Sequence, residues 1–164
     1  MKGKEIDGIM NKIALLALLF LTPAAWSQAN EITDSDKFAL WNNCGPMSLS
    51  VEVSESAAKI NLTKQDVETA VRSRLRAARL YDGEAFVALF VQVGVVGNAF
   101  GLDYVYAKPV MDLSSGLFDR NGTWLRTSYG THGQESSYIL SAISNTIDHF
   151  IDEYLRVNES GCSK

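Results

Sequence analysis

An uninterrupted run of nine apolar residues, 13–21, lies close to the start of the chain. Lys12 precedes the run, and the small residues Ser27 and Ala29 follow it, two positions apart. A positive charge, a short apolar centre and small residues before a cleavage point are typical of a secretory signal peptide. The run is about half as long as a membrane-spanning helix. We therefore expect residues 1–29 to be a signal peptide, with cleavage after Ala29 favoured over cleavage after Ser27.

The first nine residues fit such a leader poorly, because Glu5 and Asp7 are acidic. A leader that begins at Met10 would be complete, and we therefore predict that Met10 is the true initiator. Removal of residues 1–29 leaves 135 of the 164 residues. It takes away three of the 15 basic and two of the 19 acidic side chains, so the formal net charge changes from −4 to −5. We expect this acidic domain neither to bind nucleic acid nor to span a membrane.

The two cysteines, Cys44 and Cys162, lie near the two ends of the mature part. Export would place them in an oxidising compartment, where two lone cysteines usually pair. In the chain-entropy model, closing so long a loop stabilises a fold by roughly 4–5 kcal/mol. The alternative is a reactive or metal-binding pair, which lacks a histidine or a further cysteine at ligand spacing. We therefore predict a disulfide bond, and we expect neither a metal nor a cofactor.

The first half of the mature part predicts one strand and one helix. Apolar and polar side chains alternate over residues 48–54, which is typical of a half-buried strand. Thr63 then stands three residues before Asp66, close to the spacing of a capping box. Apolar residues follow at helical spacing, which predicts a helix over residues 64–81.

The second half predicts three strands and a helix. Over residues 86–96, valine and leucine occupy one face, and Phe90, Gln92 and Gly94 are among the side chains on the other. The further strands are expected at 102–112 and 123–129, with a loop over 113–122, and the apolar stripe of the last helix spans 136–157. The reversal between the first two of these strands is expected at Gly97-Asn98 or at Phe100-Gly101.

This order, β-α-β-β-β-α, predicts an α+β fold. The simplest way to bury the apolar faces is a two-layer sandwich, with two helices on one face of a four-stranded, mostly antiparallel sheet. Residues 30–43 are polar and acidic, and we expect them to be a flexible lead-in. Residues 44–162 are then expected to form a single globular domain.

His132 is the strongest catalytic candidate, because it stands in a Gly-Thr-His-Gly turn where an exposed imidazole could act as a general base. General acid–base chemistry also needs a partner, and none stands at a fixed spacing from this residue. The alternative is a structural turn in which the imidazole bonds to backbone groups. The sequence leaves both interpretations open.

Arg72, Arg76 and Arg79 form a basic stripe on the predicted first helix. Such a stripe could bind phosphate, an acidic lipid or a protein partner. The alternative is a solvated helix face, in which the arginine stems cover apolar surface and the guanidinium groups pair with nearby carboxylates. If the stripe is the contact, reversing its three charges should abolish partner capture without unfolding the protein.

Two other patterns are interpreted as structural. His149 and Glu153 are four residues apart on the last helix, which supplies at most half of a metal site. Gly94, Gly97 and Gly101 do not follow the order of a phosphate-binding loop. We interpret these three residues as hairpin glycines.

Four segments and the last cysteine together carry a resemblance. They are Trp-Asn-Asn-Cys at 41–44, the arginine-rich segment 72–81, Gly-Thr-His-Gly at 130–133, Glu-Tyr-Leu-Arg-Val-Asn-Glu at 153–159, and Cys162. In these segments the chain resembles a family of small exported bacterial proteins of unknown function. The resemblance implies export and paired cysteines, and it implies no activity, ligand or catalytic residue.

The sequence therefore favours an exported, non-enzymatic domain of the bacterial envelope, or a secreted one, that binds a protein partner or a small ligand. The candidate contact is the stripe of Arg72, Arg76 and Arg79. The alternative is a small periplasmic hydrolase that uses His132.

Overall fold

The computed structural model describes residues 31–162; the predicted signal peptide and Met10 lie outside them. All of the elements below belong to one compact unit that begins at Ile32. They are helix α2 (Asp34–Leu40), strand β1 (Ser48–Val53), the 3-10 helix η2 (Glu55–Ile60), helix α3 (Lys64–Ala77), strands β2 (Ala88–Val96), β3 (Ala99–Met111) and β4 (Phe118–Thr131), and helix α4 (Ser136–Cys162). The predicted α+β class is confirmed, and helices α2 and η2 are added to the predicted order.

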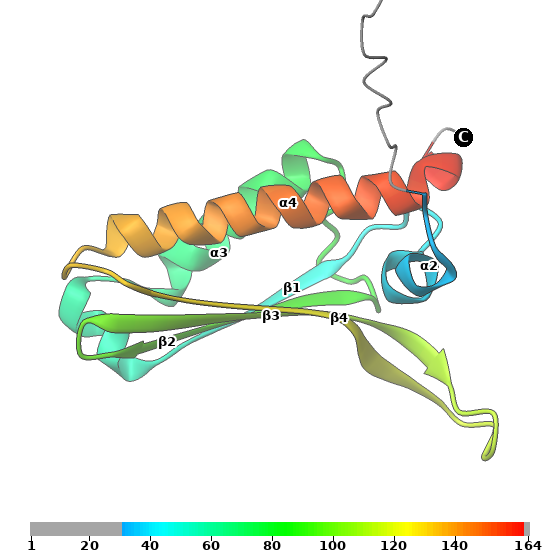
Figure 1. Ribbon diagram of the computed structural model, residues 1–164, viewed down its shortest axis with the longest axis horizontal. Coiled ribbons are helices and arrows are strands. Elements are labelled where there is room, and N and C mark those ends of the chain that lie inside the picture. The colour runs from blue at the N-terminus through cyan, green and yellow to red at the C-terminus, as the bar shows by residue number, and fades with distance from the viewer. Residues whose placement is uncertain (1–30, 163–164) are drawn as a thin grey trace, which may run out of the picture. The chain divides into compact units, whose positions relative to one another are not determined.

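The four strands form one sheet in the order β1-β2-β3-β4. Strand β1 pairs with β2 in parallel, whereas β2 with β3 and β3 with β4 pair antiparallel. A parallel pair needs a crossover connection, and η2 with α3 supplies it between β1 and β2. Figure 1 shows α3 and α4 on the same side of the sheet, as the two-layer scheme predicts.

Helix α3 begins at the predicted capping box. The Thr63 hydroxyl accepts a hydrogen bond from the Asp66 N–H at 3.2 Å, and the Asp66 carboxylate accepts one from the Thr63 N–H at 3.0 Å. The Thr63 hydroxyl also donates to the Asp66 carboxylate at 2.6 Å. This bond, together with the one from the Thr63 N–H, favours the ionised carboxylate and lowers the pKa of Asp66 below its usual value. The start of the helix therefore carries its own local signal.

The end of α3 comes earlier than predicted. The helix ends at Ala77, and Arg79 then adopts a left-handed conformation with a φ of +60°. The Leu80 N–H donates to the Leu75 carbonyl oxygen at 2.8 Å, which is the closing bond of a Schellman motif. The prediction ran on to residue 81 because the buried Leu80 continues the apolar pattern beyond the last helical turn.

Helix α2 occupies the segment for which we expected a flexible lead-in, residues 30–43. A capping box over residues 33–36 begins it, and Leu40 is buried at its end. The Lys108 ammonium group donates to the Trp41 carbonyl oxygen, 2.9 Å away, just beyond the last turn. Burial lowers the pKa of this lysine. The segment is therefore a capped and packed helix.

Strands β3 and β4 run beyond the rest of the sheet as a two-stranded hairpin. The pairing with β2 ends at Ala107, whereas β3 continues to Met111 in contact with β4. The register shifts between Tyr106 and Ala107, and Figure 1 shows the hairpin bending away from the helices. The prediction of a loop over residues 113–122 is wrong for residues 118–122, which belong to β4.

The core lies between the sheet and the two long helices. The Tyr106 ring lies 5.8 Å, between centroids, from the rings of both Phe150 and Tyr154. Burial raises the pKa of Tyr104 to about 12, and it also raises the pKa of Tyr106 and Tyr154. Because both long helices lie on one side, no helix of the described residues forms a layer on the opposite face of the sheet (Figure 1). We call this opposite side the outer face.

Candidate functional site

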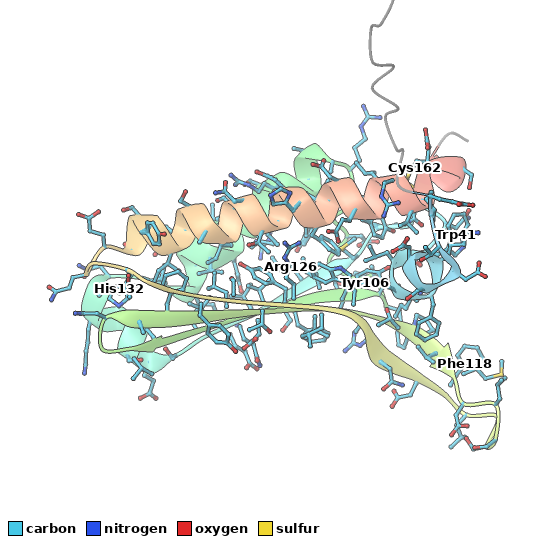
Figure 2. All side chains as sticks on the ribbon, viewed as in Figure 1. Trp41, Tyr106, Phe118, Arg126, His132 and Cys162 are labelled. Atoms are coloured by element: carbon cyan, nitrogen blue, oxygen red, sulfur yellow. A yellow bond between two sulfur atoms is a disulfide. The ribbon has the colours of Figure 1, made fainter. Side chains whose placement is uncertain are left out.

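The predicted disulfide is confirmed. Cys44 and Cys162 are bonded, with their Cα atoms 5.0 Å apart, and they join the segment after α2 to the last residue of α4. Figure 2 shows Trp41 and Cys162 near the same end of α4. Because both cysteines of the chain are paired, neither supplies a thiolate for catalysis or for metal binding.

A buried carboxamide holds the same two segments together. Asn158 is fully buried on α4, and its Oδ1 accepts hydrogen bonds from the backbone N–H groups of Asn42 and Cys44 at 2.8 and 3.1 Å. Its Nδ2 donates to the carbonyl oxygens of Leu40 and Tyr154 at 2.9 and 2.8 Å. Every polar group of this side chain is therefore satisfied, as a buried amide requires.

The two segments also approach closely at the end of α4. A Cβ atom on Gly161 would lie only 2.8 Å from the carbonyl carbon of Asn43. Asn43 and Cys44 both have positive φ angles, of 49° and 58°. We call the disulfide, the Asn158 hydrogen bonds and this contact the clasp. Two segments of the resemblance, 41–44 and 153–159, therefore meet in a structural feature.

His132 is part of the fold. It is only 2% exposed, and its Nε2 lies 3.1 Å from the Gly97 carbonyl oxygen. Its Nδ1 accepts a hydrogen bond from the Gln134 N–H at 3.0 Å, so both ring nitrogens are engaged with backbone groups. The imidazole joins the β2–β3 turn to the β4–α4 connection. This is the structural interpretation that the sequence left open.

The arginine stripe is partly held in place by its neighbours. Arg72 pairs with the Glu68 carboxylate at 3.1 Å, and its guanidinium carbon lies 5.5 Å from the centre of the Tyr81 ring. The Arg76 guanidinium carbon lies 5.1 Å from the same ring. Arg79 is exposed and occupies the left-handed position after α3. A partner-binding role for the stripe stays a prediction.

The pair His149 and Glu153 does not act as a unit. The Glu153 carboxylate accepts a hydrogen bond from the Trp124 indole at 3.1 Å and pairs with Arg126 at 3.5 Å. Figure 2 shows Arg126 between the sheet and α4. Within residues 31–162, no group of three or more histidine, cysteine or acidic side chains could hold a metal ion.

The outer face has an apolar row that the fold does not use. The strand register aligns Phe90 with Val105, and Val105 with Leu125. Leu125 is 69% exposed, and Phe86, just before β2, is 61% exposed. Exposed apolar side chains that gather on one surface are typical of an interaction site.

Arg120 lies over the end of this apolar row. Its guanidinium carbon lies 5.6 Å from the centre of the Phe86 ring and 5.3 Å from that of Phe90. Its Nη1 donates to the Phe86 carbonyl oxygen at 3.2 Å. These contacts hold the two aromatic rings beside a positive charge at the base of the hairpin.

A polar row runs beside the apolar one. The register places Glu52, Gln92, Asp103 and Thr127 opposite one another across the four strands. Gln92 donates to one oxygen of Glu52 at 2.9 Å, and Thr127 donates to one oxygen of Asp103 at 2.7 Å. A shallow depression lined by Glu52, Gln92 and Asp103 also includes Gly94. Two carboxylates therefore flank an open part of the outer face.

The next row consists of two glycines and an aromatic ring. Gly94 pairs with Gly101, and Gly101 pairs with Tyr129, which is 82% exposed. Of the three predicted hairpin glycines, only Gly97 stands in the turn, with a φ of +60°. The interpretation as hairpin glycines is confirmed, because Gly94 and Gly101 pair with each other across the two strands of the same β2–β3 hairpin.

No pattern in the sequence predicts a role for this face. The alternation over residues 86–96 already placed Phe90, Gln92 and Gly94 on one side of a strand. The sequence did not indicate which face of the sheet the helices cover. It also did not indicate which residues of β3 and β4 lie beside these three residues of β2. The unusual signal was an aromatic ring and a glycine on the face opposite the valines.

Comparison with known proteins adds no relative, since no family model, curated protein or solved structure matches the chain significantly. The part of the chain that the structure describes has no helix that is both long and apolar enough to cross a membrane. The outer face, with its exposed apolar row, is the candidate site among the described residues.

Proposed function

We propose that the protein is an exported, disulfide-linked domain that acts by binding, without enzymatic activity of its own, and that it holds a protein partner on its outer face. The observation that carries the proposal is the exposed apolar row, with Leu125 69% exposed in the middle of a well-formed strand. Leaving such a side chain in water forgoes the stabilisation that burial would supply. A partner that covers the row would recover it.

The β3–β4 hairpin extends the proposed binding surface. Its tip exposes Leu113, Leu117 and Phe118, with Leu113 91% exposed. Hydrogen bonds within the turn hold its shape: the Asp112 N–H donates to the Leu117 carbonyl oxygen at 2.9 Å, and the Asp112 carboxylate accepts from the Ser114 N–H at 2.8 Å. Apolar side chains on a preorganised turn cost little to bury against a partner.

Export is part of the proposal. The leader pattern over residues 1–29 supports it, and so does the disulfide between Cys44 and Cys162, which would persist in an oxidising compartment. The location that fits both is the bacterial periplasm or the extracellular medium. The resemblance to small exported bacterial proteins points to the same location.

The burial of His132 argues against the alternative of a hydrolase that uses this residue as its general base. A general base needs a nitrogen that can reach a substrate proton, whereas His132 is buried and both of its ring nitrogens are engaged with backbone groups. We therefore do not carry this alternative further.

Site-specific cross-linking tests the proposal. A photoreactive amino acid replaces Leu125 in the full chain, and the protein is irradiated in cells that export it. We expect a discrete cross-linked product that contains a second protein. The same amino acid at His149, exposed on α4, serves as the matched control. A product formed equally from both positions, or from neither, would contradict a binding role of the outer face.

A further inference from the structure

The outer face carries three rows of different chemistry, side by side. The first is apolar (Phe90, Val105 and Leu125), the second polar and acidic (Glu52, Gln92, Asp103 and Thr127), and the third is the pair Gly94 and Gly101 with Tyr129. Neighbouring rows are separated by two residues along each strand, about 7 Å. A segment that lies along a strand would therefore meet the rows in succession.

We propose that the outer face binds an extended segment of the partner in which an apolar side chain is followed, about 7 Å further on, by a lysine or arginine. The apolar side chain would lie on the first row, and the cation would lie between the carboxylates of the second. This inference rests on the proposed function and adds the chemistry of the occupant.

Charge complementarity favours a cation in the second row. Only one oxygen of Glu52 and one of Asp103 accept the hydrogen bonds from Gln92 and Thr127. Within residues 31–162, no hydrogen bond engages the other oxygen of either carboxylate, so it is open to a ligand. A lysine or arginine placed over Gln92, between the two carboxylates, would be attracted by both, and the exposed ring of Tyr129 in the next row offers a face for the cation.

The bare backbone at Gly94 supports close approach by a ligand. A Cβ atom there would meet only the Gly101 carbonyl oxygen, at 4.0 Å, and Gly94 has no positive φ. The fold would therefore accept a side chain at this position. Glycine within a strand weakens the strand, and it often marks a place where another chain or ligand approaches the backbone. At Gly101, by contrast, a Cβ atom would lie 3.4 Å from the ring of Tyr129, so this glycine is covered by an aromatic side chain.

A second copy of this chain is a poorer occupant. If two outer faces packed about a two-fold axis through the acidic row, they would bring Glu52 and Asp103 of one copy close to the same carboxylates of the other. Like charges at a buried contact are unfavourable. A partner that supplies the positive charge avoids this repulsion.

Fluorescence anisotropy tests the occupant directly. The probe is a labelled peptide that repeats Leu-Thr-Lys-Thr, in which leucine and lysine alternate about 7 Å apart along one face of an extended chain, and it is compared with a peptide that repeats Leu-Thr-Glu-Thr. The protein is the mature chain with its disulfide intact. We expect binding of the lysine peptide only. The double variant Glu52→Gln/Asp103→Asn should weaken binding of the lysine peptide about tenfold, since each exposed ion pair contributes modestly to affinity.

A charge-matched control separates the site from the overall acidity of the protein. Glu84→Gln/Asp152→Asn removes two exposed carboxylates elsewhere on the described surface, and we expect it to leave the affinity for the lysine peptide unchanged. Equal weakening by both double variants would overturn the inference, because it would mean non-specific attraction. Equal binding of the lysine and glutamate peptides would overturn it as well.

Gly94 provides a second, steric test. Gly94→Val should keep or raise the thermal stability, because the added side chain meets open space. The variant should nevertheless weaken binding of the lysine peptide, because the valine side chain covers the bare backbone beside the carboxylates. Unchanged affinity in the folded variant would contradict the inference.

The two levels of the account can fail separately. If Leu125 forms the cross-link but the protein does not prefer the lysine peptide, the outer face remains the proposed binding surface. The claim that the partner supplies a lysine or arginine would then be wrong. A cross-linked product made of two copies of this chain, with a dimer mass in light scattering, would reject the proposed occupant in favour of self-association.

Discussion

The side-chain oxygen of Asn158 accepts a hydrogen bond from the backbone N–H of Cys44, 3.1 Å away and 114 positions earlier in the chain. The same oxygen accepts from the Asn42 N–H, so one buried amide holds the loop that leads into the disulfide. The disulfide constrains the distance between the two segments, whereas Asn158 fixes their conformation.

Replacing Asn158 with alanine should therefore be costly. The backbone N–H groups of Asn42 and Cys44 and the carbonyl oxygen of Leu40 would lose their partner inside the protein, which should lower the free energy of unfolding by about 3 kcal/mol. Urea denaturation with the disulfide intact measures this loss. Asn121→Ala, on the exposed hairpin, is the control and should change stability by less than about 0.5 kcal/mol. Similar values for the two variants would contradict a role of Asn158 in the clasp.

His132→Ala should loosen the connection between the β2–β3 turn and the start of α4. The Gln134 N–H and the Gly97 carbonyl oxygen would each lose a bond to the ring, and we expect a destabilisation of about 2 kcal/mol. Amide hydrogen exchange at Gln134 should become faster, as measured by NMR. His149→Ala, in an exposed position on α4, should leave this exchange rate unchanged. If exchange at Gln134 stays slow in the first variant, the structural role is wrong.

The capping box of α3 should make stability depend on pH. Folding lowers the pKa of Asp66 below its ordinary value of 3.8, so the contribution of this carboxylate to stability is present above that value and is lost as the pH falls through the folded pKa. Asp66→Ala should therefore lower the Tm at neutral pH, and the difference from the parent protein should shrink in acid. Thermal unfolding followed by circular dichroism checks this. A difference that stays constant down to the acid range would show that the carboxylate is not involved.

The arginine stripe can be tested against the outer face. Reversing Arg72, Arg76 and Arg79 to glutamate removes the contacts with Glu68 and Tyr81, which should cost about 1 kcal/mol because these groups are near the surface. The protein should stay folded. If the outer face is the binding surface, cross-linking from Leu125 should persist in this variant. If the folded variant no longer forms the cross-linked product, the binding surface would include the arginine stripe on α3, and the assignment to the outer face would be wrong.

Local patterns predicted much of the fold. The capping spacing at Thr63 placed the start of α3, and the alternation over residues 86–96 placed β2, because both signals lie within a few residues. The pairing of Cys44 with Cys162 was predicted from the expected export of the chain, because lone cysteines usually pair in an oxidising compartment. The parallel pairing of β1 with β2 and the course of β4 over residues 118–122 depend on neighbours far along the chain, so no local pattern revealed them.

The candidate site was harder to predict than the fold. Its rows are made by register across four strands, so Glu52 and Asp103 come to lie on either side of Gln92 only after folding. The two residues singled out by type, His132 and Arg72, are used largely by the fold itself. The clasp was equally hidden, since nothing near Asn158 in the sequence marks it as the partner of residues 42 and 44.

The most direct test of the central claim compares two charge insertions at exposed apolar positions. Leu125→Glu changes the outer face, and Phe38→Glu changes α2, whose phenylalanine is similarly exposed. Both variants should keep their stability within about 0.5 kcal/mol of the parent, since both side chains lie at the surface. With the photoreactive amino acid at Phe86, the amount of cross-linked partner should fall strongly in Leu125→Glu and stay unchanged in Phe38→Glu. Equal yields from the two folded variants would contradict a partner-binding role of the outer face.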